Sequence, residues 1–318
     1  LQQIADSEMK KARVPICFNV IGLGWAGPLI IDTGTDYEKE TYLKGILSGE
    51  DIWCQGFSEP DHGSDLGSAQ CKAVKDGDEY VVNGSKIWTS LGSYAKYMIL
   101  LARTSQQSSS KYAGLSFFLA PMQAEGIEPR PIKKLTGEYG FCQTFFNDAR
   151  IPANSIMGRE GEGWQVAMAT LMFERGNVGG QAGGLSMMDI NVNDVLELAR
   201  RSKRNGKPAL EDPLIRDQMV QFLIEAKSNA LMGSKTKIPA LNTERPTAIA
   251  MSGKLRGSEL KRRFCQFAIS LQGANGGRFI SPEAVDGGKW QRIYFNSFSA
   301  TIGGGTTQVQ YNIMGERV

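Results

Sequence analysis

Two segments of the chain combine an aromatic side chain with hydroxyl groups and glycine. The first segment, Trp53 to Asp65, reads Trp-Cys-Gln-Gly-Phe-Ser-Glu-Pro-Asp-His-Gly-Ser-Asp. A tight turn of this composition can offer backbone N–H groups to an anion or a heterocycle. A plain turn with an Asx or serine cap explains the same residues equally well. The first segment is therefore compatible with a turn that binds a ligand and with a plain structural turn.

The second segment, Asn83 to Ser90, reads Asn-Gly-Ser-Lys-Ile-Trp-Thr-Ser. Its Asn83-Gly84 pair predicts a hairpin turn. Because side chains alternate along a strand, Trp88 and Ser90 should then lie on the same side of it. An aromatic ring beside a hydroxyl suits a flat ligand ring with a polar edge. Since aromatic side chains dominate buried area, a strand tryptophan is also a common core residue, and both readings stay open.

The elements that must position these segments differ along the chain. Helical spacing, with apolar residues at i, i+3 and i+4, occurs near both ends of the sequence. It surrounds Ile4, Met9 and Val14 and covers Tyr37–Leu47, Trp164–Phe173, Leu214–Met232 and Leu255–Leu271. Residues Ser202–Pro213, with Asn205-Gly206 and Pro208, should form a connecting loop. We expect a helical region at each end of the chain, the second of them a bundle.

The middle of the chain is rich in short β-type runs punctuated by turns. These runs are Glu79–Val82, Tyr97–Ala102, Leu115–Ala120 and Thr144–Phe146. We therefore expect a small, mainly antiparallel β domain over residues 51–157, between a helical domain at 1–50 and a helical bundle at 158–318. The fold class is α+β, mainly α. Because Leu1–Arg13 resembles the middle of a helix without a capping residue before it, we expect upstream sequence to be missing.

Charge and cysteine content exclude several classes of function. The 36 basic and 33 acidic residues are mixed along the chain and leave a net charge of +3. This distribution gives no block that would grip nucleic acid or an acidic membrane. The five cysteines are scattered, and a single histidine cannot complete a metal set with them, so we expect no metal and a reducing compartment. With no apolar run near ~20 residues and no signal peptide, the expected location is the cytoplasm or an organelle matrix.

The two segments occur in a fixed order with Phe141–Pro152, Gly158–Trp164 and the C-terminal Gly303–Gln310. In that order they resemble the acyl-CoA dehydrogenase family, from the first residues of the chain to the last. The resemblance implies an N-terminal helical domain, here partial, then a central β domain and a C-terminal four-helix bundle. It also implies a flavoprotein that uses FAD to oxidise an acyl-CoA to a 2-enoyl-CoA, as part of fatty acid or lipid metabolism. The expected electron acceptor is an electron-transfer flavoprotein, and the expected assembly is a homodimer or homotetramer.

The resemblance also assigns roles at the cofactor. Phe57 and Ser58 would lie beside the flavin ring, Trp88 would pack on it, and Ser90 would approach N5. Thr306 and Gln308 match positions that hold the ADP part of FAD, across a subunit interface. The residues expected at the cofactor are Gln55, Phe57, Ser58, Gly63, Ser64, Trp88, Thr89, Ser90, Thr306 and Gln308.

The base that removes the substrate Cα proton has two possible positions in the family. Many members place a glutamate just before the Gly-Thr of the C-terminal motif, where this chain has Gly304. A minority take the base from the first bundle helix, where Glu174 stands in this chain. We expect Glu174 to be the base and Gly304 to offer a backbone N–H to the thioester oxygen. Arg175 should order the site, and Ser64, Leu171, Glu174 and Arg175 should contact the substrate.

Several alternatives remain open from the sequence. Glu174 could instead be a surface or ion-paired helix residue. The chain could be a non-catalytic, FAD-binding partner subunit of a hetero-oligomer, or a flavin monooxygenase or oxidase on the same fold. His62 is expected to be a hydrogen-bonded loop residue, and Arg201 or Arg204 could replace an arginine that the family places at the FAD pyrophosphate. The acyl group of the substrate is not specified.

Overall fold

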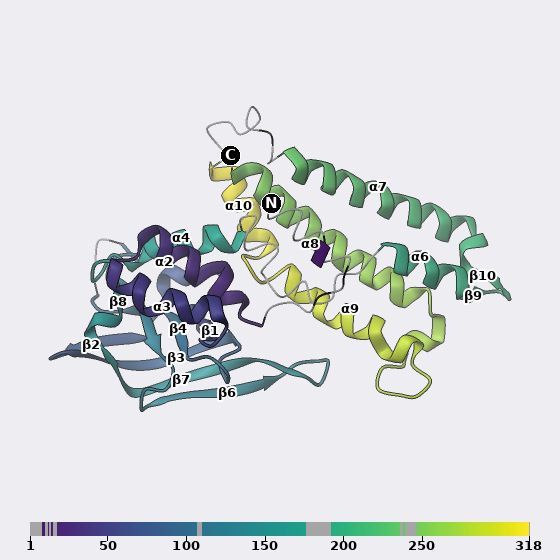
Figure 1. The fold of residues 1–318 in the computed structure, drawn as a ribbon. Helices are drawn as coiled ribbons and strands as arrows, with labels where there is room; N and C mark the ends of the chain where they lie inside the picture. The colour runs from purple at the N-terminus through teal and green to yellow at the C-terminus, as the bar shows by residue number, and fades with distance from the viewer. Residues whose placement is uncertain are drawn as a thin grey trace. The chain divides into compact units, whose positions relative to one another are not determined.

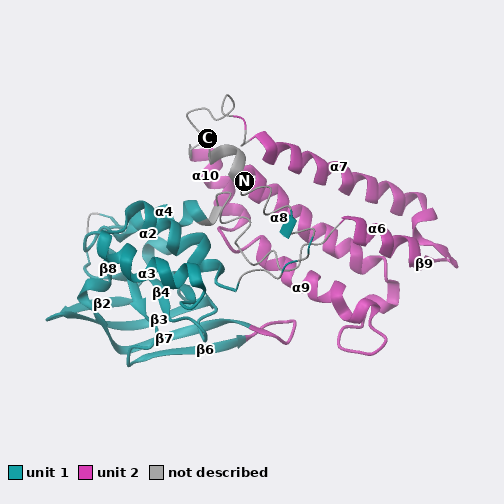
Figure 2. Ribbon diagram, viewed as in Figure 1, with its two compact units in different colours: residues 1–132, 140–187 teal, residues 133–139, 188–318 magenta. Residues whose placement is uncertain are grey.

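The chain forms two compact units, which Figure 2 colours separately. The computed structural model describes residues 8–9, 12, 14, 18–106, 110–175, 192–235, 238 and 247–317. Unit 1 comprises residues 1–132 and 140–187, and unit 2 comprises residues 133–139 and 188–318. The division into three domains expected from the sequence stays a prediction. The helical spacing expected around Ile4 falls largely outside the described residues.

Unit 1 is built on a sheet that begins at Trp53. Its strands are β1 (Trp53–Gly56), β2 (Lys72–Asp76), β3 (Glu79–Ser90), β4 (Tyr97–Arg103), β5 (Leu115–Pro121), β6 (Ile127–Lys133), β7 (Tyr139–Pro152) and β8 (Ile156–Met157). They are ordered β6-β7-β3-β2-β4-β5-β8, with β1 added on β4. The β2–β3, β3–β7, β4–β5 and β5–β8 pairs are antiparallel, whereas β1 and β2 pair with β4 in parallel. The expected mainly antiparallel β region is confirmed.

Four helical elements of unit 1 lie along the sheet. They are a turn of π-helix, η1 (Gly22–Ala26), followed by α2 (Gly27–Thr33), α3 (Asp36–Ser48) and, after the sheet, α4 (Gly163–Arg175). Figure 1 shows α2, α3 and α4 over one face of the sheet. Alternate residues of the central strands face these helices, so Ile99 and Phe117 join their core while Met98 and Phe118 belong to a second core on the other face. The helix expected over Tyr37–Leu47 is confirmed as α3.

The hairpin expected at Asn83-Gly84 is wrong. Both residues lie inside β3, and the chain reverses earlier, at Gly77-Asp78, because Asp76 pairs with Glu79 across a two-residue turn. Gly84 has a φ of +138°, and the pairing of β3 with β7 shifts between Val82 and Gly84. A Cβ atom on Gly84 would lie 3.0 Å from the Cα of Cys71. This glycine therefore permits an irregular, closely approached strand rather than a turn.

Unit 2 is a helical bundle. Its elements are α6 (Val192–Arg201), a short hairpin of β9 (Lys203–Arg204) and β10 (Lys207–Pro208), α7 (Pro213–Lys235), α8 (Thr247–Ser270), α9 (Lys289–Ala300) and α10 (Thr307–Arg317). In Figure 1, α8 runs alongside α7 and α9, and Phe222, Phe264 and Trp290 contribute to the core between them. The expected helices at 214–232 and 255–271 are confirmed. The segment expected to be a loop at Ser202–Pro213 contains the β9–β10 hairpin, which turns at Asn205-Gly206.

Helices and a sheet in these proportions confirm the α+β fold class. None of the helices in the described ranges is long and apolar enough to cross a membrane.

Candidate functional site

A bulge in β3 presents Trp88 to the outside of the sheet. Lys86 pairs with Thr144 and Thr89 pairs with Cys142, so β3 carries one residue more than β7 between these pairs. Trp88 has a φ of +60° and is 58% exposed as a residue, and its ring meets Phe141 edge-on at 6.2 Å between centroids. A bulky residue rarely adopts this left-handed backbone, which persists only where the surroundings impose it. Trp88 is therefore a displayed ring and not a core residue.

The residues after Trp88 alternate as a strand should. Thr89 is fully buried, and the Thr144 hydroxyl donates a hydrogen bond of 3.2 Å to the Thr89 hydroxyl. Ser90 is half-buried. Trp88 and Ser90 thus share the outward side of β3, as predicted. Thr89, which was expected to contact the cofactor, has no exposed surface in this conformation and supports the strand from within.

The first segment, which begins with β1, is held against β3. The backbone N–H of Ile87 donates to the Ser58 carbonyl at 2.8 Å. Phe57 is 4% exposed and packs its ring edge-on against Phe117, at 5.9 Å. The side-chain Nε2 of Gln55 is buried without a hydrogen-bond partner among the described residues. A buried donor without an acceptor is uncommon and is available to a bound polar group.

A buried ion pair links the same two segments. The Lys86 ammonium lies 2.8 Å from Glu59 Oε1, with Lys86 fully buried and Glu59 6% exposed. Burial alone would raise the pKa of Glu59, but attraction to Lys86 and hydrogen bonds from Lys86, Gln70 and Cys71 lower it below its usual value. Strict alternation would place Lys86 on the exposed side with Trp88. Since the bulge reverses that alternation, sequence reasoning missed the pair.

The turn after Glu59 carries the exposed residues Gly63 and Ser64. The backbone groups of Glu59 and His62 exchange two hydrogen bonds of 3.1 Å, which supports a structural role for His62 in this turn. Further on, the Arg103 guanidinium donates to four carbonyl groups on two adjoining loops. These are the carbonyls of Gly67, Ala69, Lys111 and Ala113. Ser64 therefore stands on a loop fixed at both ends.

The C-terminal glycine turn of unit 2 is held by its carbonyl groups. Gly304 and Gly305 have φ values of +66° and +91°. The Gly304 carbonyl accepts from Gln310 Nε2 at 2.9 Å, and the Gly305 carbonyl accepts from the Lys254 ammonium at 2.7 Å. Among the described residues, no hydrogen bond is formed by the N–H of Gly304. The turn thus keeps a backbone donor available while its carbonyls are occupied.

The turn leads into α10, and the residues expected to contact the ADP part of FAD lie where the two meet. Thr306 is half-buried, and its hydroxyl accepts from the N–H of Val309 at 3.2 Å, as a helix cap does. Gln308 is exposed. The next hydroxyl, that of Thr307, donates to Glu259 of α8 at 2.8 Å. Thr306 and Gln308 therefore stand at the ordered start of a helix.

The remaining candidates are placed only in part. Glu174 and Arg175 occupy the last turn of α4, and their side chains lie outside the described part of the structure; Leu171, one turn earlier, is half-buried. These residues belong to unit 1, whereas Gly304, Thr306 and Gln308 belong to unit 2. The structure brings the two sequence segments together, and the joining of Glu174 with Gly304 stays a prediction.

The two arginines considered for the FAD pyrophosphate already have carboxylate partners. Arg201 forms a two-pronged ion pair with Asp286, which lowers the pKa of that carboxyl chiefly through the hydrogen bond. Arg204 lies 3.3 Å from Asp212. Neither arginine is therefore a free cation in unit 2.

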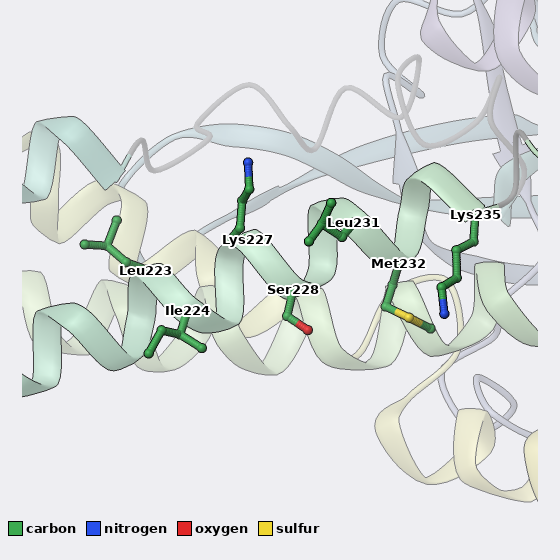
Figure 3. A pocket seen from close by; sticks show the side chains of 7 residues that line it. All are labelled: Leu223, Ile224, Lys227, Ser228, Leu231, Met232 and Lys235. Atoms are coloured by element: carbon green, nitrogen blue, oxygen red, sulfur yellow. The ribbon is translucent and has the colours of Figure 1, made fainter.

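An open apolar groove runs along α7. Figure 3 shows the seven side chains that line it, which are Leu223, Ile224, Lys227, Ser228, Leu231, Met232 and Lys235. None of them is among the residues expected at the site. Elsewhere in the described ranges, no group of three or more histidine, cysteine, aspartate or glutamate residues is placed to hold a metal ion, and the four described cysteines are free thiols.

Comparisons with known proteins agree with this arrangement. The family model for the acyl-CoA dehydrogenase middle domain matches residues 54–149, and the model for the C-terminal domain matches residues 161–318. The acyl-CoA dehydrogenase IpdE1 of Mycolicibacterium smegmatis is 36% identical over 324 residues, which cover 98% of this chain and 78% of the relative.

Solved structures show the same fold. The structure described as the Tcur3481-Tcur3483 steroid ACAD is 31% identical, with a TM-score of 0.82, and the match covers 98% of this chain and 78% of that one. The ChsE4-ChsE5 complex from Mycobacterium tuberculosis matches at 29% identity and a TM-score of 0.81, over 98% of this chain and 79% of that one. The chain therefore belongs to the acyl-CoA dehydrogenase family and is an oxidoreductase of that family.

Proposed function

We propose that this protein binds FAD and oxidises an acyl-CoA thioester between Cα and Cβ to the 2-enoyl-CoA. The observation that carries the proposal is Trp88, a tryptophan held outward in a left-handed bulge beside the half-buried Ser90. Displaying a large apolar ring to water has a free-energy cost that a stacked ligand ring removes. The reaction is inferred from the family, and the surface for a flat ring is inferred from the outward side of β3.

The residues present fit a flavin. The unpartnered Nε2 of Gln55 offers a donor for a polar edge; Ser90 lies in the same strand as Trp88, and the Ser58 segment is hydrogen-bonded to that strand. Bound FAD supplies the acceptor for the hydride that leaves the substrate Cβ. Phe57, Ser58 and Ser90 would contact its ring side, with Thr306 and Gln308 at its ADP part. Gly63 and Ser64 are exposed on a fixed loop, which suits contact with the CoA portion.

Proton removal is assigned to Glu174. Thioester α-protons are weak acids, so a positioned carboxylate contributes about 10²–10⁴-fold to the rate. Gly304 carries no side chain that could do this, and its N–H is free to donate to the thioester oxygen as negative charge develops there. Arg175 would order the site beside Glu174, and Leu171 would line the acyl pocket.

The first experiment is anaerobic reduction of the bound flavin by a panel of acyl-CoA thioesters. The panel should include straight-chain and steroid-derived acyl groups, because one matched structure is a steroid ACAD. We expect at least one thioester to bleach the flavin absorbance and denaturation of the protein to release FAD. Release of FMN would contradict the cofactor assignment. Reduced protein that reoxidises quickly in air, instead of passing electrons to an electron-transfer flavoprotein, would favour a monooxygenase or oxidase.

A second candidate is a partner subunit that binds FAD while a sister chain supplies the base. It is favoured by Gly304 at the usual base position and by the matched structures, whose descriptions join two protein names. The two candidates differ in what the purified chain does alone. A self-sufficient homodimer or homotetramer binds FAD and is reduced without help. A partner subunit remains oxidised with every thioester until the sister chain is added.

A further inference from the structure

We propose that the Lys86–Glu59 ion pair is a positioning device that fixes the turn around Phe57 and Ser58 against the strand that carries Trp88. The inference rests on the proposed function, since it concerns the surface assigned to the flavin ring. Neither side chain is assigned to the cofactor, because the Lys86 ammonium and both carboxylate oxygens of Glu59 already have partners within the protein. Their effect would reach the flavin through the two segments that they join.

The hydrogen bonds of Lys86 show which parts it joins. Its ammonium donates to Glu59 Oε1 at 2.8 Å and to the Phe57 carbonyl at 3.0 Å. Both acceptors belong to the segment after β1, whereas Lys86 itself lies in β3. The neighbouring contact from the Ile87 N–H to the Ser58 carbonyl, at 2.8 Å, connects the same two segments. Three bonds therefore cross between them over two consecutive residues of β3.

The carboxylate of Glu59 adds a third segment. Its Oε2 accepts from the Gln70 N–H at 2.7 Å, and its Oε1 accepts from the Cys71 N–H at 2.8 Å, just before β2 begins. These bonds leave both oxygens occupied. A buried charge that has lost its partner is strongly disfavoured, whereas a fully satisfied pair holds a single geometry. Lys86 and Glu59 thus permit one arrangement of the turn relative to β3.

The location of the ion pair, outside the apolar cores and beside the bulge, indicates that it positions the turn and does not simply stabilise the core. Lys86 is the last regular residue before the bulge that displays Trp88. Its bond to the Phe57 carbonyl is not part of the sheet ladder and therefore is not needed to pair β3 with β7. The cores on the two faces of the sheet are built from apolar side chains. Loss of the pair should release the turn while the sheet remains.

The test compares Lys86→Met/Glu59→Gln, which removes both charges, with the single variant Glu59→Gln. Lys96→Met is the matched control, because Lys96 makes an ion pair with Asp51 at 2.6 Å in the same unit, away from the turn. The first readout is amide hydrogen exchange in the protein without flavin. We expect exchange of the Ile87 amide to accelerate at least ~10-fold in the double variant. Amides of β4 and β5 should keep their protection, and Lys96→Met should leave Ile87 unchanged.

The second readout is the Kd for FAD and the shape of the flavin absorbance band. We expect at least a ~10-fold weaker Kd and a shifted band in the double variant, and neither change in Lys96→Met. A folded double variant with parental Ile87 exchange and parental flavin spectrum would overturn the proposal. Failure of both Glu59→Gln and the double variant to fold would overturn it too, by assigning the pair to general stability. If the parent protein bound no FAD, the proposed function would fail while Ile87 exchange still decided whether the pair positions the turn.

Discussion

Replacement of Trp88 by glycine and by alanine should separate the strain in the bulge from the role of the indole ring. The residue is 58% exposed, so about two-fifths of its surface is covered. If a fully buried indole covers ~150–250 Å², the covered part is roughly 60–100 Å² and contributes about 1.5–2.5 kcal/mol at ~25 cal/mol per Å². Both variants lose this contribution to the free energy of unfolding.

The two variants differ in the backbone. A φ of +60° costs an L-residue roughly 1–2 kcal/mol, and alanine retains this cost whereas glycine does not. The extra backbone entropy of glycine in a strand offsets about 0.5–1 kcal/mol of that gain. We therefore expect Trp88→Gly to be more stable than Trp88→Ala by roughly 0.5–1 kcal/mol, although alanine is normally the better strand residue. Urea unfolding of both proteins without flavin measures the difference.

Flavin binding should not follow this order. Loss of the stacked ring should weaken FAD binding by about 1–3 kcal/mol in both variants, which corresponds to roughly a 5- to 150-fold higher Kd. Titration of the two apoproteins with FAD measures it. Equal or greater stability of Trp88→Ala would refute the strained backbone. A parental Kd in both variants would refute the platform role.

Three further outcomes follow from other residues. Glu174→Gln keeps size and hydrogen bonding but removes the base, so flavin reduction by a good thioester should slow at least ~10²-fold while acyl-CoA binding persists; a parental rate in stopped flow would assign the base elsewhere. Gly304 has a φ of +66°, so Gly304→Ala should lower the free energy of unfolding by about 1–2 kcal/mol. Gly303 has no positive φ, so Gly303→Ala should lower it by less in the same thermal unfolding assay. The pKa of Glu59 is lowered in the folded protein, so its contribution to stability is present above its unfolded pKa and is lost as the pH falls through its folded pKa. Unfolding measured between neutral and acidic pH should therefore be less pH-dependent in Glu59→Gln, and identical profiles would contradict the shifted pKa.

The helices and the central strands could be predicted from the sequence because their signals are local. The apolar spacing over residues 214–232 and 255–271 is enough to indicate α7 and α8. The run at Leu115–Ala120 likewise corresponds to β5, where nearly every residue is buried. Such patterns of apolar residues do not depend on how the element pairs or packs with its neighbours.

Pairing irregularities could not be predicted, because they depend on two strands at once. Asn83-Gly84 has the composition of a hairpin turn, and its place within a strand follows from the pairing of Asn83 with β2 and of Gly84 with β7. The burial of Lys86 follows from the extra residue in β3, which no count along a single segment reveals. Trp88 and Ser90 were correctly placed on one side of the strand, since no further irregularity separates them.

The bulge in β3 also determines where the chain can change its length. Ile87 and Trp88 together stand opposite a single residue of β7, Gln143, between the pairs formed by Lys86 and Thr89. Removal of Ile87 would leave a regular ladder in which Lys86 and Thr89 still point inward and Trp88 still points outward. Removal of Thr89 would instead carry Ser90, the last residue of the strand, into the interior. Shortening by one residue at Ile87 would thus preserve the inward and outward faces of the strand, while removing the left-handed bulge and the residue whose N–H donates to the Ser58 carbonyl.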